Sequence, residues 1–255
     1  MLALEEQKLY YWLTSHWADD VGAVVDLGCF VGGSTARLAA GHARACHKSW
    51  IHAYDRFLAN ERTKEAYLYR NGIAEFDGAD TYWLARDLLH PWDDHITLHR
   101  GDIRHKAWDG DPIELLILDA AKSDERIDNI AETFFPHLIP GKSLVIQQDY
   151  YHWKLPWIPA QMQRMHRWFK PIAYCPDDTV IFLNTRQVDD QALAIGNIGK
   201  LTDAELLASL RRSNWRGVPW HKSRRIRKMI KVLIANPGVR IGHMMRPPDD
   251  SDSEM

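Results

Sequence analysis

The sequence predicts an α/β protein whose Rossmann-like, doubly wound sheet has seven strands, five parallel and two in a terminal antiparallel hairpin. Three observations carry this prediction. Short apolar runs rich in β-branched residues alternate with segments of helical periodicity. A turn rich in glycine follows the first run, and an acid stands at or just beyond the end of each of the first five. Residues 176–178 then form a turn-like link between two further short strands.

The elements follow one another in a regular order. Residues 3–18 have apolar and aromatic side chains at helical spacing and predict a helix packed on the sheet. Parallel strands are expected at 23–27, 50–54, 96–99, 113–118 and 144–146, and the hairpin at 171–175 and 179–183. Helices are expected to follow the glycine turn as far as about residue 45, and at 61–69, 81–89, 124–138, 158–169, 203–212 and 223–235.

The glycine turn joins the first strand to its helix, within Val24–Thr35. Gly28 can adopt backbone angles closed to other residues. Gly32 and Gly33 would let a ligand approach the main chain, and Ser34 or Thr35 could help to cap the helix. A helix N-terminus after such a turn offers free N–H groups to an anionic or polar ligand, although a strand–turn–helix crossover without a ligand fits the same pattern.

The five acids are Asp26, Asp55, Asp102, Asp119 and Asp149. Ligands of open parallel sheets bind outside the carboxyl ends of the strands, which is where these residues are expected. Asp55 is placed to accept hydrogen bonds from ribose hydroxyls, and Asp102 is expected near an adenine edge. Each acid could instead cap a helix or form a turn.

The organisation predicted is a domain at 1–186, a basic helical extension at 187–248 and a disordered acidic tail at 249–255. The connection 57–93 is a helical insertion that could act as a lid or substrate wall, or be a helical decoration. Residues 206–248 contain no acid and eleven Lys and Arg. This extension could be a solvated cover, an oligomer contact, or a surface for an anionic acceptor, a membrane or nucleic acid, with Trp215 and Trp220 interleaved among its basic residues.

The charge, the cysteine content and the distribution of apolar residues bear on the partners and location of the protein. The net charge of −2 says little about partners, and three cysteines are too few and scattered for a disulfide framework or zinc cluster. The N-terminus lacks the pattern of a signal peptide, and no apolar run approaches membrane-spanning length. A reduced, cytoplasmic location is expected.

With Gly28-Cys-Phe-Val-Gly32-Gly33 and the terminal hairpin, residues 5–186 resemble a class I S-adenosylmethionine-dependent methyltransferase. A nicotinamide enzyme would have Gly-x-Gly-x-x-Gly, whereas Phe30 stands here at the middle glycine. An aromatic residue followed by Gly-Gly-Ser resembles the macrocin O-methyltransferase-like group. The resemblance implies that S-adenosylmethionine is bound, with the contacts expected from Asp26, Gly28, Phe30, Gly32, Gly33, Ser34, Asp55, Arg56, Asp102 and Asp119.

Asp119-Ala-Ala-Lys122 and Gln148-Asp149 resemble the site of cation-dependent O-methyltransferases. The resemblance implies that Asp119, Gln148 and Asp149 bind Mg²⁺, which prefers oxygen ligands and keeps positions for water or substrate. The metal would lower the pKa of an acceptor hydroxyl, and Lys122 could take its proton. The amide–acid order is reversed relative to the catechol enzymes, and Ala121 stands where sugar-modifying relatives often have an acid. Without a metal, Lys122 or His152 would act alone.

The aromatic segment 150–157 could wall a planar or sugar-like acceptor, or belong to the core. The expected function is methyl transfer from S-adenosylmethionine to a hydroxyl of a small molecule, a sugar or polyol-bearing metabolite, with Mg²⁺. Two alternatives remain open: a cofactor-binding protein without transferase activity, acting through its basic extension, and a hydroxylase-like protein on the same fold. Nucleic acid is a minority option, because the motif of amino-methylating enzymes is absent after the fourth strand.

Overall fold

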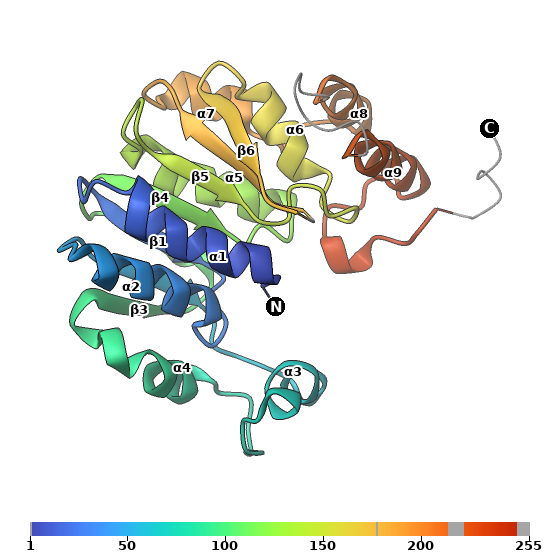
Figure 1. Cartoon of the computed structure of the whole chain (residues 1–255). Helices are drawn as coiled ribbons and strands as arrows, with labels where there is room; N and C mark the ends of the chain where they lie inside the picture. Colours follow the sequence, from blue (N-terminus) through green and yellow to red (C-terminus); the bar gives the residue numbers. More distant parts are fainter. Residues whose placement is uncertain (1, 177, 214–221, 249–255) are drawn as a thin grey trace. The chain divides into compact units, whose positions relative to one another are not determined.

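The computed structural model describes residues 2–176, 178–213 and 222–248. Trp215, Trp220 and the predicted tail 249–255 lie outside these residues. Seven strands are hydrogen-bonded in the order β3-β2-β1-β4-β5-β7-β6, which confirms the predicted sheet (Figure 1). The strands are β1 (Ala23–Leu27), β2 (Ile51–Asp55), β3 (Ile96–Arg100), β4 (Ile113–Leu118), β5 (Leu144–Gln147), β6 (Phe169–Tyr174) and β7 (Val180–Asn184).

Contacts within the chain define two compact units, of which the first ends at Ile117 and the second begins at Leu118. In the first unit, β1 pairs with β2 and β2 with β3, all parallel. Every residue of β1 is buried, as its composition, apolar and β-branched apart from Asp26, predicts. The pairing of Leu27 with Tyr54 places the carboxyl ends of β1 and β2 at the same edge.

Helix α1 (Leu4–Trp12) continues into a π-helical turn, Leu13–Trp17, and packs against α2 (Gly33–Ala45) (Figure 1). The two helices approach closely at Gly41, where an added Cβ would lie 2.2 Å from Thr14 Oγ1. Thr14 Oγ1 also donates to Leu38 O at 2.8 Å, which joins the π-helical turn to α2. The predicted first helix is therefore present, and the π-helical turn at its end packs closely against α2.

The insertion contains α3 (Glu61–Tyr67), a 3₁₀ turn at Tyr69–Asn71, α4 (Tyr82–Leu89) and a 3₁₀ segment at His90–His95. Its first helix is fastened by Lys64, whose side chain is fully buried. Lys64 Nζ donates to Phe76 O at 2.8 Å and to Gly78 O at 3.0 Å, and pairs with Glu61 at 2.6 Å. The same ammonium lies 4.6 Å from the centre of the Phe76 ring. A lysine and two carbonyls thus hold the loop between α3 and α4.

In the second unit, β7 lies between β5 and β6 and is antiparallel to both, which confirms the predicted hairpin. The helices are α5 (Asp124–Phe134), followed by a 3₁₀ turn at Phe135–His137, and α6 (Trp157–Arg164). Helix α6 ends five residues earlier than predicted. The reason is that Phe169 pairs with Asn184 in the sheet, so the chain must leave the helix before β6.

The C-terminal extension contains α7 (Asp190–Gly196), α8 (Asp203–Arg212), α9 (Lys222–Ala235) and a 3₁₀ turn at Gly242–Met244. Helices α8 and α9 lie side by side (Figure 1). Asp128 of α5 binds the chain that follows α7, because its carboxylate accepts Ile198 N at 2.9 Å and Gly199 N at 2.7 Å. Among the described residues, no helix is both long and apolar enough to span a bilayer.

Candidate functional site

The glycine turn of the first unit is an unusual stretch of backbone. Gly28, Phe30 and Gly32 have φ values of 97°, 54° and 90°. Gly28 N donates to Tyr54 O at 2.8 Å, which ties the turn to the end of β2. For Phe30 a left-handed conformation costs about 1–2 kcal/mol, so surrounding contacts must hold it. One of them is the bond from Phe30 N to Asp55 Oδ2, at 3.1 Å.

Asp26 stabilises the turn from inside. Its Oδ2 accepts hydrogen bonds from Ser34 Oγ and Thr35 Oγ1, both at 2.7 Å. The prediction that these hydroxyls cap the helix is wrong, because both residues lie within α2 and donate to Asp26. Burial raises the pKa of Asp26 to about 6, against the two hydroxyl hydrogen bonds, which lower it. Asp26 therefore joins the strand to the helix, and its predicted contact with a cofactor stays a prediction.

Gly32 is the cap residue of α2, and no side chain among the described residues makes a capping hydrogen bond there. The space beside Gly33 is open, since an added Cβ would meet no atom within 4 Å. Gly32 differs from this, because an added Cβ would lie 2.6 Å from Leu89 Cδ1. Gly32 is thus required by packing against α4 and by its positive φ, whereas Gly33 leaves room for a ligand. The uncapped first turn of α2 is suited to a carboxylate or phosphate group.

Asp55 lies beside the turn and contacts main chain on both sides. Its Oδ2 accepts Phe30 N, and its Oδ1 accepts Phe57 N at 2.7 Å. Burial raises the pKa of Asp55, although these hydrogen bonds and the charge of Arg56 lower it. A carboxylate has about four acceptor positions, so capacity for two ribose hydroxyls remains. The residues fit the ribose and carboxylate groups of S-adenosylmethionine.

Asp102 follows β3, and Gly101 N donates to Asp55 O at 2.9 Å, so the acid lies at the same edge. Its carboxylate is used locally: Oδ1 accepts Arg104 N at 3.1 Å, and Oδ2 accepts Arg104 Nη2 at 2.9 Å. It caps the short 3₁₀ turn Ile103–His105. The turn-forming role is therefore present, and the predicted adenine contact is not tested by these bonds.

The second unit brings together Asp119, Lys122 and Asp149, which we call the acid–lysine cluster. Lys122 Nζ lies 2.5 Å from Asp119 Oδ1 and also donates to Asp149 Oδ2. Gln148 N donates to Leu118 O at 3.2 Å, so the ends of β4 and β5 are adjacent. Exposed fractions of 44% for Lys122, 32% for Asp119 and 20% for Asp149 leave the cluster open to a ligand.

The charges of the cluster oppose one of the predicted roles. Burial raises the pKa of Asp119 to about 7, with Lys122 lowering it and Asp149 raising it. Burial lowers the pKa of Lys122, but the two carboxylates outweigh it and hold that pKa above its usual value. Lys122 is therefore an ammonium at neutral pH in this arrangement. That state disfavours Lys122 as a base, and its catalytic role stays a prediction.

The arrangement does not fit Mg²⁺ as it stands. An ammonium bridges Asp119 and Asp149, two of the three predicted ligands, and a metal would have to displace it. Among the described residues, no group of three or more His, Cys, Asp or Glu side chains could hold a metal ion. The prediction of Mg²⁺ is therefore without support from the geometry.

The aromatic segment after β5 divides into core and exposed residues. Tyr150, Tyr151 and Trp157 are buried, and Trp157 Nε1 donates to Ala121 O at 2.8 Å. His152 and Trp153 are half-buried, with nearly parallel rings 6.3 Å apart. Burial and the charge of Lys122 lower the pKa of His152, although Asp149 raises it. Only His152 and Trp153 remain as candidates for contact with an acceptor.

The sequence did not indicate several residues whose contacts are with residues distant in the chain. Lys64, which holds the insertion, and Arg240 and Gly242, which contact the Lys122 loop, have no local signature. A buried lysine is recognisable only once its partners Phe76 and Gly78 are known to fold back on it. The only sequence signal for the other two was that the extension is basic.

A sheet in this order, with the last strand inserted antiparallel, is that of class I S-adenosylmethionine-dependent methyltransferases, and the chain has this fold. A solved candidate O-methyltransferase from Klebsiella pneumoniae has a TM-score of 0.50 and 12% identity, over 73% of this chain and 82% of that chain. A candidate rRNA methylase from Clostridium thermocellum is less similar, with a TM-score of 0.48 and 12% identity over 72% of this chain and 99% of that one. No family model matches the sequence, and neither does any curated protein.

Proposed function

We propose that the protein is an S-adenosylmethionine-dependent O-methyltransferase that acts on a hydroxyl of a small molecule. The observation that carries the proposal is the uncapped N-terminus of α2, which follows a turn whose backbone is held by Asp55. The N–H groups would bind the carboxylate of the donor, and Asp55 would accept its ribose hydroxyls. The fold shared with methyltransferases supports this use of the turn.

Bound S-adenosylmethionine supplies an electrophilic methyl group on a sulfonium, and the chain must place an acceptor oxygen in line with it. As the hydroxyl oxygen bonds to the methyl carbon, the carbon–sulfur bond breaks and the hydroxyl proton must leave. The acid–lysine cluster has two carboxylates and one ammonium, so one negative charge is in excess. One of the two carboxylates can receive this proton, while Lys122 stays charged and hydrogen-bonds the acceptor oxygen.

His152 is the alternative proton acceptor proposed for this site. Its depressed pKa keeps it neutral near pH 7, as a base requires. However, His152 Nδ1 faces Lys154 N at 3.4 Å, which favours the tautomer with a proton on Nε2. We therefore favour the acid–lysine cluster, with a sugar or polyol-bearing metabolite as acceptor and the cytoplasm as the location.

Calorimetry with S-adenosylmethionine tests the donor half of the proposal. The unmutated chain is expected to bind, and Asp55→Ala to weaken binding about 10- to 100-fold, the size of one or two charged hydrogen bonds. Asp93→Ala is the matched control, because Asp93 has an exposed side chain whose partner among the described residues is the exposed His90. Lack of binding by the unmutated chain would refute the function. Binding without methyl transfer to any hydroxyl acceptor would favour the cofactor-binding alternative.

The metal is tested separately, by following formation of S-adenosylhomocysteine with a panel of hydroxyl acceptors. We expect turnover to persist in a chelator and Lys122→Met to abolish it. If added Mg²⁺ restored turnover after chelation, Asp119 and Asp149 would bind the metal, and the ammonium bridge would belong only to the metal-free protein.

A further inference from the structure

The loop that carries Lys122 is held by the C-terminal strap, by which we mean residues 239–245. Gly242 N donates to Lys122 O at 3.0 Å. The neighbouring residues Ser123 and Ile241 form an isolated antiparallel bridge, and Asp124 N donates to Arg240 O at 3.3 Å. Three consecutive residues, the last two of the loop and the first of α5, are thus paired with the strap, more than one hundred residues later in the chain.

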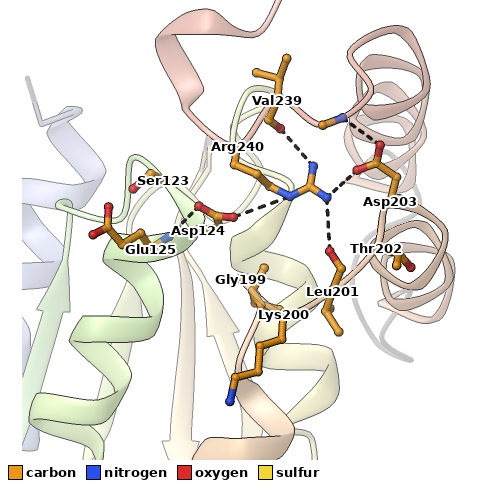
Figure 2. A network of polar contacts seen from close by, with 12 residues as sticks. Ser123, Asp124, Glu125, Gly199, Lys200, Leu201, Thr202, Asp203, Val239 and Arg240 are labelled. Atoms are coloured by element: carbon orange, nitrogen blue, oxygen red, sulfur yellow. Dashed lines mark hydrogen bonds and ion pairs between the residues drawn. The ribbon is translucent and has the colours of Figure 1, made fainter.

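Arg240 fastens the strap from both sides, as Figure 2 shows. Its guanidinium lies 3.6 Å from Asp124 Oδ2, at the start of α5, and 2.5 Å from Asp203 Oδ1, at the start of α8. It also donates to Leu201 O at 3.4 Å. Asp203 uses its second oxygen to accept Gly238 N at 2.8 Å, just before the strap. The side chains involved are at most one-third exposed, so these contacts are sheltered from solvent.

Gly242 places the strap against two loops at once. An added Cβ would lie 2.6 Å from Leu155 Cδ2, 3.4 Å from Lys122 O and 3.6 Å from Lys154 O. Lys122 belongs to the loop after β4, and Lys154 and Leu155 to the loop after β5. These loops carry the acids of the acid–lysine cluster, so the strap touches both sides of it.

The strap is itself closed at its base. Asn236 Nδ2 donates to Arg246 O at 2.9 Å, and Asn236 Oδ1 accepts Arg246 N at 3.0 Å. Met245 is buried. Helix α9 also contacts the loop after β5, because Lys228 Nζ lies 5.1 Å from the centre of the Trp153 ring. The extension is therefore a preformed support rather than a loose cover.

We propose that the C-terminal strap is a positioning element, which sets the main chain of Lys122 and thereby places its ammonium between Asp119 and Asp149. The inference rests on the proposed function for its catalytic meaning, but the placement of Lys122 is a property of the protein alone. Arg240 and Gly242 are the positioning residues. They act through Lys122 and touch neither of the two acids in the described contacts.

Lysine acetylation followed by peptide mass spectrometry tests the placement without any substrate. In the unmutated chain Lys122 is held by two carboxylates and is expected to react slowly. Arg240→Ala and Gly242→Val are expected to raise its acetylation rate roughly tenfold, as for a loss of about one pKa unit of stabilisation of the ammonium. Arg240→Lys keeps the charge but replaces the planar guanidinium that contacts both Asp124 and Asp203. Its rate of Lys122 acetylation is expected to lie between those of the unmutated chain and Arg240→Ala. Arg246→Ala is the matched control, because its side chain is exposed.

The same variants are then assayed for methyl transfer and for binding of S-adenosylmethionine. We expect kcat to fall about 10- to 100-fold, as for a misplaced catalytic group, with the dissociation constant of the donor changed less than about twofold. Unchanged acetylation of Lys122 in variants that remain folded by circular dichroism would overturn the inference. If the unmutated chain failed to bind the donor, the proposed function would fail, while the acetylation rates would still decide the role of the strap.

Discussion

Substitution of Gly32 by alanine separates the two reasons why this position is glycine. Its φ of 90° costs an alanine about 1–2 kcal/mol. The added Cβ would also lie 2.6 Å from Leu89 Cδ1 and 2.8 Å from Leu89 Cγ, and overpacking of this kind costs about 1–3 kcal/mol. Leu89 is buried and cannot move freely. We therefore expect Gly32→Ala to lower the free energy of unfolding by about 2–5 kcal/mol.

The chain offers a matched control at Gly72, which has a φ of 89° and no atom within 4 Å of an added Cβ. Gly72→Ala should cost only the backbone contribution, about 1–2 kcal/mol. Urea unfolding followed by tryptophan fluorescence measures both, and Leu89→Ala combined with Gly32→Ala should recover part of the loss. Equal losses at Gly32 and Gly72, or strict additivity with Leu89→Ala, would refute the packing argument.

Three further predictions concern stability. Asp26 has a folded pKa of about 6 against an ordinary 3.8, so the carboxyl of the unfolded chain ionises first and the stability from this group falls as pH rises through that window. The advantage of the unmutated chain over Asp26→Asn in urea unfolding should therefore fall by about 2 kcal/mol between pH 4 and 7. Lys64→Met should cost about 1–3 kcal/mol by removing the buried ammonium that donates to Phe76 O and Gly78 O, and should speed hydrogen exchange in residues 72–80, whereas Lys8→Met, at an exposed pair, should do neither. Trp157→Phe should cost about 1–3 kcal/mol by removing the donor to Ala121 O, and an unchanged melting temperature would contradict it.

Much of the fold could be predicted because its signals are local. The strands Ala23–Leu27 and Ile113–Leu118 were predicted to the residue, since each is an apolar run interrupted by a single acid and bounded by glycine, proline or a polar residue. Helix Asp203–Arg212 was equally clear, with Thr202 and Glu205 forming a capping box at its start. Helix α7 was missed because seven residues give too few turns for a periodic pattern.

The candidate site was less predictable, because side-chain partners depend on distant chain. The acids at the strand ends were found, but sequence spacing does not reveal that Asp26 accepts hydrogen bonds from Ser34 and Thr35. Nor could it show that Lys122 would bridge Asp119 and Asp149, because the last two are thirty residues apart. The strap contacts join still more distant residues and had no pattern of their own.

The two hydrogen bonds of Asp55 have a consequence for how the first unit responds to a ligand. One oxygen holds Phe30, within the glycine turn, and the other holds Phe57, the first residue of the insertion. Both phenylalanines have left-handed backbones, with φ of 54°, and so depend on such support. Any molecule that recruits this carboxylate, or any proton that neutralises it, acts on the turn and the insertion together. One side chain thus couples the order of two segments that lie 27 residues apart in the chain.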